Sequence, residues 1–352
     1  MAKIDDVIDA AQTVADQSIP VDEKVRILMQ ENARLRKKIT KEEAGWELLD
    51  GIVSEVYDAP TGIRVISPKK SRKKQIEVAV LHLSDLHFGK RTKDFNIAVA
   101  EERMIKLGQA VFDIVNIRKK WAAIDKVIVL WGGDFLENES GIFPTQPHLV
   151  DIDLLDQMIK IGPEIVTNTM LQVGGVFNKV EVRAVPGNHG RLSHFNSQRS
   201  NADSVFYEVA RKMLAMTDKS FAGRIEWDLP LDRDPGSEWF SRFPIIGDHG
   251  GMLIHGHEVR GALGFPWYGV GKKVQGWNTS KATRGFNNFW MGHFHTAAAF
   301  KLNDVYVMAS GTIESSNEYA LQNMASGGSP NQRLTFFNER YGMLADHLIS
   351  LD

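Results

Sequence analysis

The sequence contains no cysteine among its 352 residues. This absence excludes disulfide bonds, zinc sites built on thiolates and a cysteine nucleophile. Any metal ion must therefore be held by histidine, carboxylate, amide or backbone oxygen ligands. The remaining composition, with 43% hydrophobic and 24% charged residues, is that of a globular protein. The length is compatible with about two domains.

Long apolar runs and a strong excess of one charge are also missing. No stretch of about 18 apolar residues occurs, so we expect no membrane-spanning helix. The first residues carry acidic side chains and no long apolar stretch, unlike a secretory signal, and we expect a cytoplasmic protein. The formal net charge of −2 gives no sign of nucleic-acid binding, although a balanced total can contain a basic patch.

Residues 1–75 differ in pattern from the rest of the chain. The spacing of apolar residues between Ile4 and Val14 predicts a short amphipathic helix. Over residues 21–39, such residues recur at alternating intervals of four and three, with Asn32 at one of these positions. This spacing favours a coiled coil that forms a homodimer or binds a partner protein. A surface helix packed on its own domain fits the pattern equally well.

The chain then changes from helical to strand-like patterns. Residues 51–65 are typical of a strand, and the basic stretch 67–74 (SPKKSRKK) predicts a linker. From residue 76, alternating β and α signals give way to consecutive strands, which predicts an α/β core with a mixed sheet or two sheets. We expect strands near 78–83, 127–130, 180–185, 224–228, 251–255, 288–292, 297–301 and 305–309, and helices near 104–115, 150–172 and 202–215.

Five polar motifs follow apolar runs, at the strand ends where open α/β sheets place their ligand sites. They are Asp85-Leu86-His87, Gly133-Asp134, Gly187-Asn188-His189, His255-Gly256-His257 and Gly292-His293-Phe294-His295. In an extended chain, residues i and i+2 point to the same side. Asp85 and His87 can therefore reach one ion, and His293 and His295 can converge in the same way.

The motif residues also suit two different tasks. Asn188 and His189 are adjacent and point apart, so one can face a metal while the other faces a substrate. The glycines at 133, 187 and 292 permit close approaches that a side chain would block.

Imidazole with carboxylate suits Mn, Fe, Zn or Ni better than Ca. Two such ions about 3.5–4 Å apart can contact both the attacking and the leaving oxygen in phosphoryl transfer.

The five motifs in this order resemble those of the calcineurin-like metallophosphoesterase superfamily, which run D-x-H, G-D, G-N-H, H and G-H-x-H. The resemblance covers about residues 78–312. It implies a catalytic domain over 76–352 after an N-terminal helical extension, with two facing mixed β-sheets flanked by helices, an α/β/β/α sandwich. The segment Ser310-Gly311-Thr312 resembles the short segment that closes the site in relatives.

The resemblance also implies two divalent cations, with Mn favoured over Fe, Zn, Ni and Mg. It places the first ion on Asp85, His87, Asp134 and His295, and the second on Asn188, His255 and His293, with Asp134 bridging the two. A water activated by the pair would attack the phosphorus.

Residues beside the ligands have implied roles too. His189 would stand beside the substrate and stabilise the transition state or protonate the leaving oxygen. Arg191 binds a phosphate oxygen or is a surface charge. Many relatives have Asp or Glu where this chain has Gly190, so another carboxylate such as Asp203 would have to orient His189. His257 stands where some relatives have Asp, and we expect it beside the ligands.

The stretch 259–290, between two ligand motifs, is the strongest indication of a substrate. It has no acidic residue and combines cations with aromatic residues, the composition expected of contacts to single-stranded nucleic acid. Aromatic residues in the core and solvated lysines are the alternative interpretation. The candidate nucleic-acid contacts are Arg260, Trp267, Tyr268, Lys272, Lys273, Lys281 and Arg284.

These features lead to the hypothesis of a metal-dependent phosphodiesterase or nuclease, with DNA the favoured substrate. The chain then resembles the exonuclease subunits of double-strand-break repair complexes (the SbcD type) more than the protein phosphatases. A phosphodiesterase or phosphatase for small nucleotides is the first alternative. A non-catalytic scaffold that has kept the fold is the second.

Overall fold

The structure is a computed structural model that describes residues 20–58, 74–139, 149–193, 197–260, 265–315 and 329–352. The chain divides into two units, 1–71 and 72–352. No helix in the described ranges combines the length and the apolar character needed to cross a membrane.

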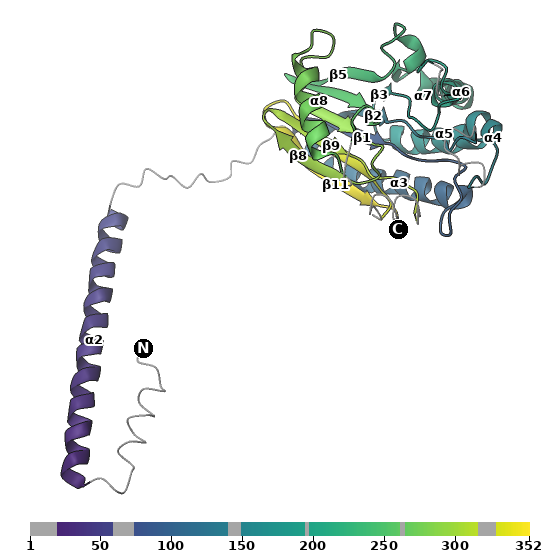
Figure 1. Cartoon of the computed structure of the whole chain (residues 1–352). Coiled ribbons are helices and arrows are strands. Elements are labelled where there is room, and N and C mark those ends of the chain that lie inside the picture. Colours follow the sequence, from purple (N-terminus) through teal and green to yellow (C-terminus); the bar gives the residue numbers. More distant parts are fainter. Residues whose placement is uncertain (1–19, 59–73, 140–148, 194–196, 261–264, 316–328) are drawn as a thin grey trace. The chain divides into compact units, whose positions relative to one another are not determined.

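The first unit contains one long helix, α2 (Val21–Asp58) (Figure 1). The helix includes residues 51–58, so the strand predicted from residue 51 is wrong over that part. The β-branched residues that suggested a strand are only weakly biased against a helix, and context overrides such preferences. The helix predicted between Ile4 and Val14, residues 59–65 and most of the predicted linker lie outside the described residues.

The second unit contains two mixed β-sheets, which confirms the predicted fold class. The six-stranded sheet has the order β11-β10-β1-β2-β3-β4, and the five-stranded sheet has the order β5-β6-β7-β9-β8. The first sheet consists of β1 (Gln75–Leu83), β2 (Ala122–Trp131), β3 (Lys179–Ala184), β4 (Ile225–Asp228), β10 (Asn331–Asn338) and β11 (Gly342–Ser350). The second consists of β5 (Phe240–Ile246), β6 (His249–Ile254), β7 (Asn288–Met291), β8 (Ala298–Leu302) and β9 (Val305–Ala309).

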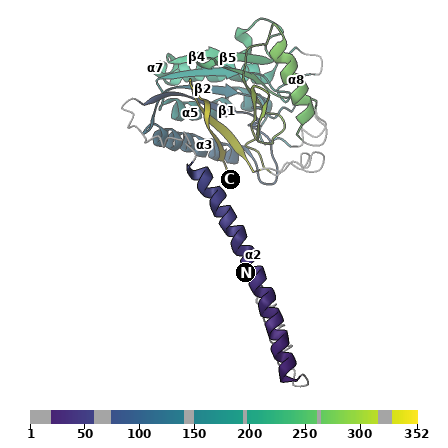
Figure 2. The ribbon, with the colours of Figure 1, turned by 90° about the vertical axis from the view of Figure 1, so that its left-hand side faces the viewer.

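Helices cover the outer faces of both sheets, with α8 on one side and α3, α5 and α6 on the other (Figures 1 and 2). The helices of this unit are α3 (Ile97–Arg118), α4 (Leu154–Ile159), α5 (Ile161–Gly174), α6 (Ala202–Thr217), α7 (Lys219–Ala222) and α8 (Trp267–Thr279), with a 3₁₀ turn at Pro230–Asp232. The helix expected near 150–172 is α4 followed by α5, because the backbone at Lys160 leaves the helical region (φ −128°, ψ −81°).

The core explains why the central strands are apolar throughout. Leu81 and Leu83 of β1 pack in the layer that contains the α3, α5 and α6 side chains. Val78 and Val80, which alternate with them, pack between the two sheets. A third apolar layer joins the second sheet to Val270 of α8. A strand buried on both faces has no polar alternation, as expected for parallel strands covered on both sides.

Three strands were not expected from the sequence: β5, β10 and β11. β10 is buried along its whole length although it contains Gln332 and Arg333. Gln332 exchanges two hydrogen bonds with the backbone of Ser84, at 2.9 and 3.0 Å. Polar residues inside a buried strand conceal its apolar pattern, and here they support the loop that follows β1.

Candidate metal centre

All five motifs lie at the carboxyl ends of parallel strands. β1, β2 and β3 are parallel in one sheet, and β6 and β7 are parallel in the other. The two sheets meet at these ends, because His255 Nδ1 lies 2.7 Å from the carbonyl oxygen of Gly132. The backbone N–H of His293 also donates to both carboxylate oxygens of Asp85, at 3.0 Å each. The fold therefore brings motifs that lie between residues 85 and 295 to one edge.

The backbone of these loops is strained where the candidate ligands lie. Among the described non-glycine residues, only six have a positive φ. Five of them are candidate ligands, with φ between 45° and 69°: Asp85, His87, Asp134, His293 and His295. Such conformations cost about 1–3 kcal/mol each and cluster at functional sites, where surrounding contacts maintain them. The strain therefore singles out five of the seven candidate ligands.

Two motif glycines leave room for the carboxylates. A Cβ atom at Gly187 would lie 2.0 Å from Asp134 Oδ1, and one at Gly292 would lie 2.2 Å from Asp85 Oδ2. Any side chain at either position would displace a candidate ligand.

The first group of candidate ligands comprises Asp85, His87 and His295, whose ligand atoms lie within 4.8 Å of one another. His87 Nε2 lies 3.1 Å from His295 Nε2, which in turn lies 3.4 Å from Asp85 Oδ1. Carboxylates hold the other ring nitrogens: His87 Nδ1 lies 2.9 Å from Glu137 Oε2, and His295 Nδ1 lies 2.7 Å from Glu314 Oε1. The hydrogen bond at His87 Nδ1 favours the tautomer whose Nε2 carries a lone pair.

The second group comprises Asp134, His255 and His293. His255 donates from Nδ1 to the Gly132 carbonyl, so its Nε2 faces Asp134 Oδ2 at 2.9 Å and Asn188 Oδ1 at 3.0 Å. Asp134 Oδ2 is buried and accepts no well-formed hydrogen bond from the described residues. An imidazole nitrogen, a carboxylate oxygen and an amide oxygen thus converge, and all three are electron-pair donors.

The ionisable side chains of the second group shift one another's pKa values. Burial alone would raise the pKa of Asp134, but His255 and His189 outweigh it and hold this pKa well below its usual value. Burial opposes the charged form of His255, but Asp134 overcomes it and raises the pKa of His255 to about 10. Burial and the neighbouring His255 lower the pKa of His293 to about 3. Converging donors need a shared proton or a cation, and bound metal would replace the proton.

The donor set fits divalent metal ions. Buried carboxylates face imidazole nitrogens, and an acceptor lies beside the second ring nitrogen of His87, His255 and His295. Such surroundings are found around Zn, Mn and Fe in proteins. The structure brings together the seven predicted ligands as two neighbouring groups. Asp134 falls in the second group, and its bridging role stays a prediction.

Two facing mixed sheets with these motifs at their meeting edge are the arrangement that the resemblance to calcineurin-like metallophosphoesterases implies. No family model matches the chain, and no curated protein matches it.

Solved structures are similar to the chain at low identity. The Vps29 of Entamoeba histolytica complexed with Zn²⁺ is 12% identical, with a TM-score of 0.34, over 78% of this chain and 99% of that one. A predicted phosphoesterase of Streptococcus pneumoniae is 12% identical, with a TM-score of 0.28, over 78% and 98%. A structure described as a novel archaeal phosphodiesterase is 12% identical, with a TM-score of 0.35, over 77% and 99%.

The motif at residues 187–190 has Gly190 where the resemblance leads us to expect a carboxylate, and the structure gives the reason. A Cβ atom there would lie 2.0 Å from Asn201 Oδ1, because the start of α6 packs against this loop. Glu137 supplies the carboxylate instead, with its oxygens 3.2 and 3.3 Å from His189 Nδ1. Burial opposes the charged form of His189, but Glu137 and Asp134 raise its pKa above the usual value.

Asp203, expected as a substitute partner of His189, has another task. Its carboxylate accepts hydrogen bonds from the backbone N–H groups of Gly187 at 2.8 Å, Asp134 at 2.9 Å and Phe135 at 3.2 Å. Burial, with the nearby charge of Asp134, raises the pKa of Asp203 to about 6. Asp203 therefore holds the loops after β2 and β3 together.

Sequence reasoning missed Glu137, Glu314 and Lys90. Lys90 Nζ lies 2.9 Å from Glu314 Oε2 and 3.6 Å from Glu137 Oε2, so one buried cation joins the two carboxylates that hold the histidines. The sequence position of both acidic residues, shortly after a predicted motif, could have indicated them. Glu137 lies three residues after Asp134, and Glu314 lies two residues after the segment Ser310–Thr312.

The remaining predicted positions lie around the two groups. Thr312 Oγ1 donates to the backbone carbonyl of Asp85 at 2.7 Å, so the segment Ser310–Thr312 does lie against the first motif. The His257 ring centre lies 5.4 Å from that of His255, and His257 Nε2 lies 3.2 Å from Gln198 Nε2. Arg191 forms a β-bridge with Asn201, which places it beside the start of α6.

Some aromatic residues of the insertion 259–290 are buried in the core, and others are exposed to solvent. Phe265, Phe286, Phe289 and Trp290 are buried, so the core interpretation holds for these four aromatic residues. Trp267 and Tyr268, at the start of α8, are 58% and 83% exposed. The five cations named as contacts are exposed as well: Arg260, Lys272, Lys273, Lys281 and Arg284.

Ring contacts connect the start of α8 to the metal motifs. Phe294, between His293 and His295, has its ring centre 5.9 Å from that of Phe265. The Phe265 ring centre lies 4.6 Å from that of Trp267. The exposed Trp267 is therefore two ring contacts away from the loop of the last motif.

Proposed function

We propose that this protein is a dinuclear metal-dependent phosphodiesterase that hydrolyses nucleic acid, with DNA as the favoured substrate and Mn²⁺ as the favoured metal. The observation that carries the proposal is the convergence of buried nitrogen and oxygen donors in two adjacent groups. Asp85, His87 and His295 would hold one ion. Asn188, His255 and His293 would hold the other, with Asp134 between them.

Two bound divalent cations supply Lewis acidity, which neutralises phosphate charge and favours deprotonation of water. In the hydrolysis, a P–O bond to the water oxygen forms and the P–O bond to the leaving oxygen breaks. The leaving oxygen needs a proton, and His189 is the residue suited to deliver it. Glu137 fixes the ring through Nδ1, so the proton comes from Nε2. Arg191 is our candidate for a phosphate oxygen contact.

The nucleic-acid substrate is inferred from the insertion. Exposed Trp267 and Tyr268 offer faces on which bases stack, and Lys272 and Lys273 are exposed on the same helix. The absence of acidic residues from 259–290 means that no local carboxylate would repel a phosphate backbone.

The test compares substrates and metals in one assay. Purified full-length protein is incubated with Mn²⁺ or with EDTA, and single-stranded DNA, duplex DNA, RNA, cyclic nucleotides and bis-p-nitrophenyl phosphate are offered in parallel. We expect metal-dependent cleavage of nucleic acid that EDTA abolishes and that Asp134→Asn lacks. Turnover of only the small esters would support a small-nucleotide phosphodiesterase. Metal binding without any hydrolysis would support a scaffold.

A further inference from the structure

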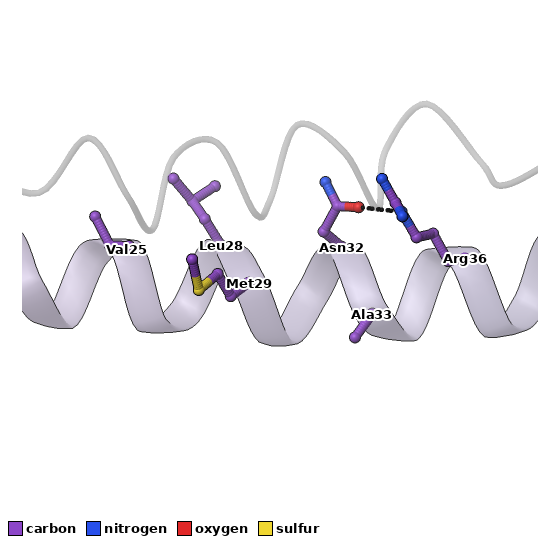
Figure 3. A pocket seen from close by; sticks show the side chains of 6 residues that line it. All are labelled: Val25, Leu28, Met29, Asn32, Ala33 and Arg36. Carbon is purple, nitrogen blue, oxygen red and sulfur yellow. Dashed lines mark hydrogen bonds between the residues drawn. The ribbon is translucent and has the colours of Figure 1, made fainter.

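The helix α2 has an exposed apolar face. At 38 residues it is about 57 Å long, and helices in water are stabilised mainly by packing of an apolar face rather than by propensity. Val25, Leu28 and Asn32 project to one side of the helix (Figure 3). Val25 is 44% exposed and Leu28 is 46% exposed, values that are high for aliphatic side chains.

The sequence of α2 keeps a heptad repeat along the helix. The sequence alone predicts this repeat over residues 21–39. Since α2 continues to Asp58, the next repeats fall on the same helix. The a positions are Val25, Asn32, Ile39, Trp46 and Val53, and the d positions are Val21, Leu28, Leu35, Glu42, Leu49 and Val56. Nine of these eleven residues are apolar, over five heptads, which meets the length expected of a coiled coil.

The charged residues beside this face select the partner. In a parallel, in-register pair, a g residue of one helix faces the e residue of the next heptad in the other. Glu31 (g) then faces Arg36 (e) of the other copy, and Lys38 (g) faces Glu43 (e). Both pairs are of opposite charge, and each occurs twice in a symmetric dimer. The helix is thus complementary to itself.

Asn32 adds a preference for orientation. In the single chain its Oδ1 accepts a hydrogen bond from Arg36 Nε at 3.0 Å (Figure 3). An asparagine at an a position favours two parallel strands in register, because it pairs with the same residue of the partner. An antiparallel pair would place Asn32 opposite a d position and leave the buried amide without this partner.

We propose that α2 forms a parallel two-stranded coiled coil with a second copy of this chain. One assembly then contains two copies of the unit 72–352. The proposal rests on α2 alone, so it stands or falls independently of the proposed catalytic function.

The first test is the mass of the full-length protein in solution by sedimentation equilibrium. We expect twice the chain mass of 39.5 kDa. Leu28→Glu combined with Leu35→Glu places charge at two d positions and should reduce the mass to that of one chain. Gln30→Glu combined with Lys37→Glu changes f positions on the opposite side and should leave the dimer intact. Thermal unfolding of the unit 72–352, followed by tryptophan fluorescence, should not differ between the variants.

A single-chain mass for the unaltered protein at tens of micromolar would overturn the proposal. It would indicate that another part of the chain, such as residues 1–19, or a different protein covers this face. A mass of three or more chains would also overturn it.

A second test fixes the orientation. Because the chain has no cysteine, Leu28→Cys introduces a single thiol at a d position. Oxidation should then give a covalent dimer, whereas Lys37→Cys at an f position should not. In an antiparallel pair the two residues at 28 lie near opposite ends, so a lack of cross-linking in a protein of dimeric mass would refute the parallel arrangement.

Discussion

Glu137 offers the sharpest test of the metal centre, because one buried carboxylate holds two histidines with different tasks. It contacts Nδ1 of His87, a candidate ligand, at 2.9 Å and Nδ1 of His189, the candidate proton donor, at 3.2 Å. We predict that Glu137→Gln impairs both metal affinity and turnover. Loss of a group that orients a metal-bound histidine typically costs 10–100-fold, equivalent to about 1.4–2.8 kcal/mol.

The fold should survive this change. Lys90 loses one partner at 3.6 Å but keeps the closer Glu314 at 2.9 Å, so no buried cation is left unpaired. Thermal unfolding should therefore show one cooperative transition, as in the unaltered protein. Glu101→Gln, an exposed position on α3, is the matched control and should leave every measured quantity unchanged.

Two measurements separate the two histidines. Titration calorimetry with Mn²⁺ gives the metal affinity, in which we expect a 10–100-fold loss through His87. The value of kcat at saturating Mn²⁺ then gives the contribution of His189, for which we expect a further loss of at least 10-fold with little change in KM. A kcat within twofold of the unaltered enzyme, at unchanged metal affinity, would refute the reasoning.

Three further predictions concern single roles. Asp134→Asn should lower the bound metal, measured by mass spectrometry, and abolish turnover, since Oδ2 faces His255; unchanged activity would contradict the site. His189→Ala should keep the metal but slow turnover by about 10²–10⁴-fold, and loss of metal would mean that its role is misassigned. Lys272→Glu with Lys273→Glu should weaken DNA binding and its salt dependence by about one unit of log–log slope per lysine. Anisotropy at several salt concentrations measures this slope, with Lys212→Glu on α6 as the control; an unchanged slope would favour a small-nucleotide substrate.

The sequence was informative where chemistry and local structure coincide. Asp85-Leu86-His87 follows an apolar run, so both the strand and the polar loop after it could be assigned. The sequence was misleading where a residue type has a role in packing that its chemistry does not suggest. Gln332 and Arg333 conceal the strand β10, and the aromatic residues Phe286 and Phe289 resemble a binding surface although they are core.

The sequence also did not reveal contacts between residues that lie far apart in the chain. Glu137 and Glu314 are 177 positions apart in the chain, yet both contact Lys90 and each holds a ring nitrogen of a candidate ligand. No spacing rule relates such residues, because their proximity depends on how the two sheets meet. Gly190 removed the expected neighbour of His189, and only the fold showed that α6 fills that space and that Glu137 compensates.

The sequence by itself determined which side chains carry the chemistry and the order in which they occur, because ligand type and strand-end position are local properties. The tertiary structure decided which nitrogen of each histidine is available, which carboxylates orient the rings and which aromatic residues remain exposed. These are properties of packing between segments distant in sequence. The helix α2 also corrects a sequence prediction, since residues 51–58 have only a weak local preference for strand and belong to a continuous helix.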